Sequence, residues 1–155
     1  MTQTIGAKSM RNAKIAYNTL GFGTSWVDFS GVLNSVEVSG GDRITGEVFT
    51  ADGDTPIVLF GKLNPIDVTG NIVYSEISTE AFTSLVPLYV AGTNLRVRWA
   101  PAGDGTGAYR FMTGTTNFTQ FGYPGGEVGA GEPILVEFAV KTGTITYEVM
   151  TTATL

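Results

Sequence analysis

The chain has 155 residues, of which 43% are apolar and 15% charged, a size and composition typical of one folded domain and unlike those of disordered chains. It contains no cysteine and no histidine, which excludes disulfides, thiolate chemistry and a serine–histidine catalytic triad. The net charge is −5, yet Lys8, Arg11 and Lys14 give residues 1–14 a charge of +3, so the remaining chain carries −8 and is expected to repel nucleic acid.

The first forty residues contain two stretches in which apolar and polar side chains alternate. This two-residue period predicts strands over residues 13–18 and 32–39. Turn-forming residues end the two patterns, Gly21 and Gly23 after the first and Gly40, Gly41 and Asp42 after the second.

Residues 42–62 form the segment that most strongly suggests an interaction. Two short β-prone runs, 44–49 and 57–60, flank the spacer 50–56, which is typical of a loop or a long hairpin tip. If the domain core does not cover the apolar side chains of these runs, a neighbouring subunit would have to. The alternative is a hairpin folded onto its own core. The residues that need covering are Val48, Phe49, Ile57, Val58 and Phe60.

The middle of the chain predicts one long strand and one helix. The strand covers residues 66–75, with Gly70 as the position of a bulge. The helix is expected over residues 79–91, because Ser78 is a good N-cap, Glu80 suits the first turn and Gly92 is a typical stop. Pro87 removes an internal hydrogen bond, so it is expected to kink or shorten this helix.

The last third of the chain predicts further strands. They cover residues 94–99, 109–111 and 118–123, and the last of these changes parity in the manner of a bulge. After a glycine-rich loop, the clearest strand covers residues 134–140, and a tight turn then joins it to residues 145–149 in a predicted terminal hairpin.

These elements amount to about eight strands and one helix without βαβ alternation. The predicted fold class is therefore mainly β, an antiparallel β-sandwich or barrel with one flanking α-helix. Residues 1–12, with Lys8 and Arg11, are expected to form an N-terminal arm, and residues 13–155 a single domain. No apolar run of about 18 residues and no leader pattern is present, so no membrane span or secretory signal is expected.

Three loops invite a ligand interpretation that their residues do not sustain. Residues 21–25 superficially resemble a phosphate-binding glycine loop, as do residues 103–107, but no helix and no lysine follow, which favours plain turns. Asp52 and Asp54 place two carboxylates on one loop, whereas calcium needs six to eight oxygen ligands, which favours a solvated acidic loop. No metal or cofactor is expected.

Catalysis by carboxylates would need two acids that converge across a cleft. The candidates occur mostly on the polar faces of predicted strands, where a solvated face is the simpler interpretation. Arg96 and Arg98 are too few for a nucleic-acid patch and are expected to pair with acidic residues within a sheet or across a subunit boundary. We therefore expect no enzyme. The candidate carboxylates are Asp28, Glu37, Asp67, Glu76, Glu137 and Glu148.

The order of these segments resembles the major tail proteins, or tail tube proteins, of long-tailed bacteriophages, whose fold is related to the tube of contractile injection machines. The resemblance extends over most of the chain and includes the lone helix. The other segments that carry it are residues 28–31, 39–43, 45–47, 52–56, 61–62, 65–68 and 140–146.

The resemblance implies a structural virion protein. Such proteins are made in the host cytoplasm, close into hexameric rings through sheet extension, and stack into a hollow tube around the tape-measure protein, through which DNA later passes. By position, residues 42–62 match the family's long hairpin at ring contacts and residues 1–12 match its N-terminal arm, with Lys8 and Arg11. The subunit-contact residues expected from this match are Asp42, Arg43, Glu47, Val48, Phe49, Asp52, Asp54, Ile57, Phe60 and Lys62.

Two other functions fit the composition. A capsid decoration protein or a tail-terminator ring would also be rich in β-strands and lack catalytic residues, and it need not form a polymer. A carbohydrate-binding or carbohydrate-cleaving β-sandwich would use Trp26, Trp99 and Tyr109 as stacking surfaces and two carboxylates for catalysis.

Overall fold

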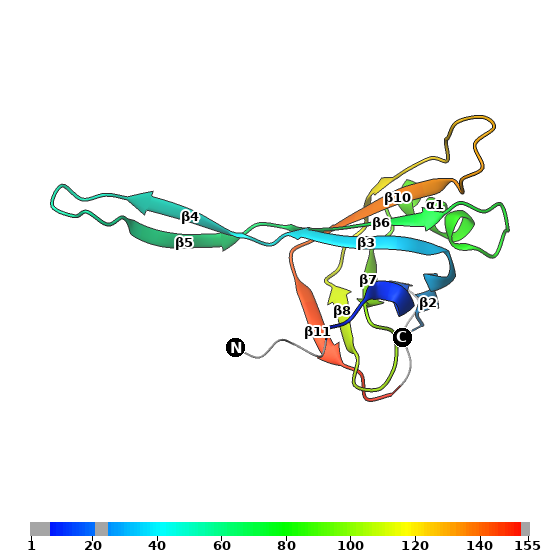
Figure 1. Cartoon of the computed structure of the whole chain (residues 1–155), viewed down its shortest axis with the longest axis horizontal. Coiled ribbons are helices and arrows are strands. Elements are labelled where there is room, and N and C mark those ends of the chain that lie inside the picture. Colours follow the sequence, from blue (N-terminus) through cyan, green and yellow to red (C-terminus); the bar gives the residue numbers. More distant parts are fainter. Residues whose placement is uncertain (1–6, 21–24, 153–155) are drawn as a thin grey trace.

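Two antiparallel sheets and one helix form the body of the molecule, from which a long hairpin projects (Figure 1). The computed structural model describes residues 7–20 and 25–152. The five-stranded sheet has the order β11 (Ile145–Val149), β8 (Tyr109–Thr113), β7 (Leu95–Ala100), β1 (Lys14–Thr19) and β2 (Val27–Asp28). The four-stranded sheet has the order β3 (Leu33–Gly40), β6 (Ile66–Val73), β10 (Leu135–Thr142) and β9 (Phe118–Phe121).

The projecting hairpin consists of β4 (Arg43–Val48) and β5 (Ile57–Leu63), which pair with each other and with no other strand of residues 7–20 and 25–152. The helix α1 spans Ala81–Ala91, and two short 3-10 turns span Met10–Asn12 and Ser30–Val32. The predicted fold class, an antiparallel β-sandwich with one flanking helix, is confirmed. The described residues contain eleven strands where about eight were expected, partly because the two-residue β2 is too short for its alternation to be recognised.

The core lies between the two sheets. Alternate residues of β7 and β1 point toward it from the five-stranded sheet, and alternate residues of β6 and β10 point toward it from the other. β6 shows the alternating burial of a half-buried strand, whereas β1 and β7 are largely buried on both faces. Among the described residues no helix has the length and apolar character needed to cross a bilayer. Fully buried members of the core include Ile15, Leu95, Val97, Val68, Ile72, Val136, Phe138 and Val140.

Helix α1 covers one side of the four-stranded sheet, and Leu85 is fully buried there. It begins at Ala81 after Glu80, and no side chain caps it, so the prediction that Ser78 is the N-cap is wrong. Gly92, with φ of 61°, ends the helix as predicted. The helix continues through Pro87, which was expected to kink or shorten it, and this residue lies on the exposed side, where water can reach the carbonyl group that lost its partner.

Gly70 is not a bulge, contrary to the prediction. It stands in a regular ladder opposite Val36 on one side and Phe138 on the other. A Cβ atom at this position would lie 2.7 Å from both Phe138 Cζ and the Ser35 carbonyl oxygen, so glycine is needed for close approach. The bulge predicted from the parity change near Phe118 is confirmed, because the β9–β10 register shifts beside this residue.

The predicted terminal hairpin is also wrong, because β10 and β11 belong to different sheets. Both edges of β10 are already occupied, by β6 and by β9, and β11 pairs with β8 instead. Thr142 helps to turn the chain from one sheet to the other. Its hydroxyl donates to the Thr144 carbonyl at 2.9 Å and accepts from the Gly114 amide at 3.2 Å.

Candidate functional site

The hairpin of residues 42–64 continues β3 and β6 beyond the body (Figure 1). Its root keeps the strand pairing, since the Gly41 amide donates to the Pro65 carbonyl at 3.2 Å and the Asn64 amide donates to the Asp42 carbonyl at 2.8 Å. Gly40, with φ of 83°, lies so close to the Pro65 carbonyl that a Cβ atom there would be 2.4 Å from its oxygen. The glycines of the root therefore allow the two strands to leave the sheet together.

Every residue of β4 and β5 is exposed. The alternative in which the hairpin folds onto its own core is therefore wrong for the isolated chain. All ten residues predicted for subunit contact lie on this hairpin and are exposed, from Asp42 at its root to Asp52 and Asp54 near its tip. Sequence reasoning missed Ile44, Leu59 and Leu63, although the unbroken apolar run of β5 signals that both faces of this strand are apolar.

The register divides the hairpin into two faces. Gly46 stands opposite Leu59 and Val48 opposite Ile57, and Ile44 extends the same side of β4. This side, the aliphatic face, contains Ile44, Gly46, Val48, Ile57 and Leu59. The other face is mixed, because Thr45 stands opposite Phe60 and Glu47 opposite Val58.

The exposed apolar area of this hairpin is unusually large for an isolated chain. Eight of its large apolar side chains are 44–71% exposed, which leaves on the order of 800 Å² of apolar surface uncovered on the two faces together. A two-stranded hairpin is at best marginally stable in water without a covering surface. The eight are Ile44, Val48, Phe49, Ile57, Val58, Leu59, Phe60 and Leu63.

The described part of the N-terminal arm, residues 7–12, is mostly or fully exposed, with Lys8 and Arg11 in solvent. Residues 1–6 lie outside the described residues. The arm meets the body beside the turn that joins β7 to β8, where the Asn12 carbonyl oxygen is 3.2 Å from the position of a Cβ atom on Gly103. Lys8 and Arg11 take no part in the two ion pairs of the described chain, which join Lys141 to Asp67 and Arg110 to Glu148.

The candidate carboxylates do not converge. Asp67 and Glu148 form the ion pairs just named, and Glu137 accepts a hydrogen bond from Gln120 at 3.1 Å. Glu76 lies 3.3 Å from the hydroxyl of Tyr74. Each of these acids is bound by a neighbour on its own strand pair or turn, as the interpretation of a solvated strand face predicts.

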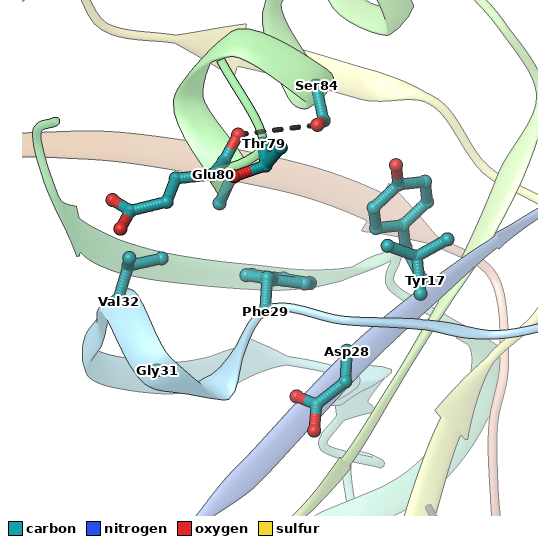
Figure 2. A pocket seen from close by; sticks show the side chains of 10 residues that line it. Tyr17, Asp28, Phe29, Gly31, Val32, Thr79, Glu80 and Ser84 are labelled. Atoms are coloured by element: carbon teal, nitrogen blue, oxygen red, sulfur yellow. Dashed lines mark hydrogen bonds between the residues drawn. The ribbon is translucent and has the colours of Figure 1, made fainter. Parts of the chain in front are cut away.

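A hollow of about 220 Å³ lies between β2, the turn that follows it and the start of α1. Figure 2 shows that the Asp28 carboxylate points away from the helix and that the Glu80 carboxylate lies near Val32. Asp28 accepts a hydrogen bond from the Ser30 amide at 2.8 Å. The two acids at this hollow therefore face different directions and form no pair. Burial raises the pKa of the Tyr17 hydroxyl, which also lines it.

The aromatic residues considered for carbohydrate stacking have other contacts. The Arg98 guanidinium lies 3.9 Å from the centre of the Trp26 ring, in place of the expected acidic partner. Desolvation, together with the nearby positive charge of Arg110, lowers the pKa of Arg98 to about 10. Trp99 is buried and stacks on Phe111, with ring centres 5.8 Å apart. The phosphate-loop interpretation of residues 21–25 falls mainly on residues outside those described.

Comparison of the fold with known proteins gives a consistent result. One solved structure with the same arrangement is the SPP1 tail tube, with a TM-score of 0.68, 9% identity, and coverage of 93% of this chain and 80% of that chain. The fold is the tail-tube fold. A chain of the sheath–tube complex of the PVC extracellular contractile injection system also shares it, with a TM-score of 0.64, 13% identity, and coverage of 97% and 100%.

A third structure with the tail-tube fold is the C6-symmetric tail of an empty gene transfer agent particle. It has a TM-score of 0.63 and 14% identity, and the match covers 93% of this chain and 99% of that chain. No protein-family model and no curated protein matches the sequence. At these identities the likeness concerns the fold, and at that level the predicted resemblance to tail tube proteins is confirmed.

Proposed function

We propose that this protein is the tube subunit of a phage-like tail, a structural and non-enzymatic protein that assembles with copies of itself into stacked rings. The observation that carries this proposal is a tail-tube fold with a projecting hairpin whose apolar side chains are uncovered in the isolated chain. Both features are expected of a subunit whose exposed apolar side chains are covered by neighbouring copies.

Ring closure would use the two open edges of the four-stranded sheet. In the described part of the chain its edge strands, β3 and β9, lack a partner on one side, so β9 of one copy can pair with β3 of the next and extend the sheet around a ring. Six copies per ring is the number supported by the C6 symmetry of the gene transfer agent tail.

The outer face of the same sheet suits a channel for DNA. Glu37 and Asp67 stand on this face opposite polar residues, and Glu137 stands opposite Asn71, while the alternate residues point into the core. With Lys141 as the neighbouring cation, the face carries an excess of negative charge. Turned toward the lumen of a ring, it would repel the phosphate backbone and let DNA pass without binding.

The remaining parts of the proposal follow from the same role. The tape-measure protein would occupy the lumen before DNA passage, other tail proteins would contact the ends of the tube, and the protein would reside in the virion after synthesis in the host cytoplasm. The arm of residues 1–12 and the hairpin contact residues would act between subunits, on a single domain of residues 13–155.

A shortened hairpin tests this role. Removing Ala51 to Pro56 and replacing Phe49 and Thr50 by Asn-Gly closes the strands with a two-residue turn after the paired residues Val48 and Ile57. We expect a folded monomer with strongly reduced assembly, because the removed residues are at least partly exposed and touch none of the core. Analytical ultracentrifugation measures the assembly and circular dichroism the fold. An unfolded variant would place the tip within the folding unit, and wild-type assembly would contradict its contact role.

A further inference from the structure

A second uncovered apolar surface lies on β8 and β11. Tyr109 stands opposite Val149 and Phe111 opposite Tyr147, so these four residues share one side of the strand pair and form the aromatic patch. Tyr109, Tyr147 and Val149 are 53%, 69% and 50% exposed. The rings are in contact, with centres 6.0 Å apart for Tyr109 and Tyr147 and 6.2 Å apart for Phe111 and Tyr147.

The aromatic patch continues the core beyond the edge of the opposite sheet. Phe111 stacks on the buried Trp99, so the four residues stand on the side of the sheet that faces the core. Among the described residues β11 is an edge strand that pairs with β8 alone, so the patch lies at the border of the sandwich, where the four-stranded sheet no longer covers it. This surface therefore has the chemistry of a core, and no layer of the described residues covers it.

The N-terminal arm leaves the body at the same end of the five-stranded sheet. The Asn12 carbonyl lies against Gly103 in the turn that leads into β8. The residues that flank the patch are held to this turn, since the Met150 amide donates to the Ala108 carbonyl at 2.9 Å and the Gly107 amide donates to the Met150 carbonyl at 2.8 Å. An apolar surface and a basic arm are thus neighbours in this part of the molecule.

The hairpin is complementary to this region, because it has an apolar face that suits the aromatic patch and an acidic tip that suits the basic arm. Its aliphatic face is apolar, and the hairpin of residues 42–64 contains four acidic residues and two basic ones, with Asp52 and Asp54 at the tip. Residues 1–14 contain three basic residues and no acidic one. Charge complementarity therefore adds to the match between the aliphatic face and the aromatic patch.

We propose that the hairpin of one copy docks on the aromatic patch of a second copy, with its aliphatic face on Tyr109 and Tyr147 and its acidic tip toward the basic arm. The hairpin points away from its own body, so it cannot cover the patch of the same chain (Figure 1). The four large side chains of the aliphatic face, Ile44, Val48, Ile57 and Leu59, are 48–67% exposed. They leave on the order of 400 Å² uncovered, about half of what each partner contributes to a standard protein–protein interface.

This contact joins two different surfaces, so each copy can donate one hairpin and accept another. Such a head-to-tail contact generates rings or open stacks rather than closed dimers, which agrees with the proposed tube. The inference rests on the proposed function for the presence of a second copy, and it adds the surface that receives the hairpin.

Single-cysteine variants test this contact, because the natural sequence contains no cysteine and the introduced thiol is therefore the only one that can be crosslinked. Leu59→Cys places a thiol on the aliphatic face, Val149→Cys one on the aromatic patch, and Val90→Cys, 72% exposed on α1, serves as the control. Mixtures of two variants are assembled and treated with a short bis-maleimide, which does not require disulfide geometry.

We expect crosslinked dimers from Leu59→Cys mixed with Val149→Cys, on the order of ten-fold more than from Leu59→Cys mixed with Val90→Cys, because docking raises the effective concentration of the two thiols. Tubes that form without this preference, or dimers of Leu59→Cys with itself, would overturn the docking surface and leave the proposed function standing. Absence of rings and tubes from the cysteine-free protein would overturn both.

Discussion

Replacing Leu59 and Phe60 by aspartate is expected to abolish ring and tube formation while the monomer stays folded. The two side chains are 67% and 71% exposed and stand on opposite faces of the hairpin, since Leu59 is opposite Gly46 and Phe60 opposite Thr45. Burial of each against a neighbour would contribute about 1.5–3 kcal/mol, and a carboxylate at either position adds the cost of desolvating a charge. Negative-stain electron microscopy measures the assembly.

The control for this double variant is Val90→Asp, an equally drastic change at an exposed position of α1. We expect it to assemble as the natural protein does. The free energy of unfolding of the monomeric hairpin variant should differ from that of the wild type by less than about 0.5 kcal/mol, because surface substitutions away from packed features have small effects. Wild-type tubes from the Leu59 and Phe60 variant would refute the role of the hairpin.

Replacing Phe138 by alanine is expected to lower the free energy of unfolding by about 3–5 kcal/mol, the usual cost of removing a buried aromatic ring. Phe138 is completely buried, and its ring lies 6.0 Å from those of both Phe29 and Phe118. It also packs over Gly70, which has no side chain to fill the cavity. Urea unfolding followed by tryptophan fluorescence gives the change in free energy.

Phe60→Ala provides the matched comparison for this core variant. It removes the same side chain from a position that is 71% exposed, so monomer stability should change by less than about 0.5 kcal/mol. Equal losses for the two variants would mean that the hairpin belongs to the cooperative unit of the body. The pair therefore separates a residue that holds the fold from one that is available to a neighbour.

Local patterns predicted the elements whose formation depends on adjacent residues. The alternation of apolar and polar residues placed β1, β3, β6 and β10 to within a few residues. It reflects alternating burial in β6, whereas β1 is buried on both faces. Gly92 marked the end of α1 because the left-handed conformation at a helix end favours glycine. The mainly β fold followed from these strands and the single helix.

Pairing over long separations could not be predicted in the same way. The terminal hairpin failed because the sequence does not reveal that β6 and β9 occupy both edges of β10. Gly70 was mistaken for a bulge because nothing local indicates that the ring of Phe138 lies over it. The aromatic patch was missed for the same reason, since Tyr109 and Tyr147 meet only through the pairing of β8 with β11.

The candidate site was predicted in outline. The excess of apolar residues in residues 42–62 indicated a hairpin whose side chains need a covering surface, and the exposure of every residue of β4 and β5 gives that expectation a physical basis. The aliphatic face was not predicted, because it depends on the register that places Leu59 beside Gly46 and Ile57 beside Val48.

Electron microscopy of the purified, unmodified protein at high concentration tests the central claim most directly. We expect six-membered rings that stack into hollow tubes, because both the sheet edges and the hairpin are then covered by neighbouring copies. Single rings that never stack would instead indicate a terminator, and decoration of capsids without rings would indicate a decoration protein. Persistent monomers at high concentration would contradict the proposal that this protein forms a tube.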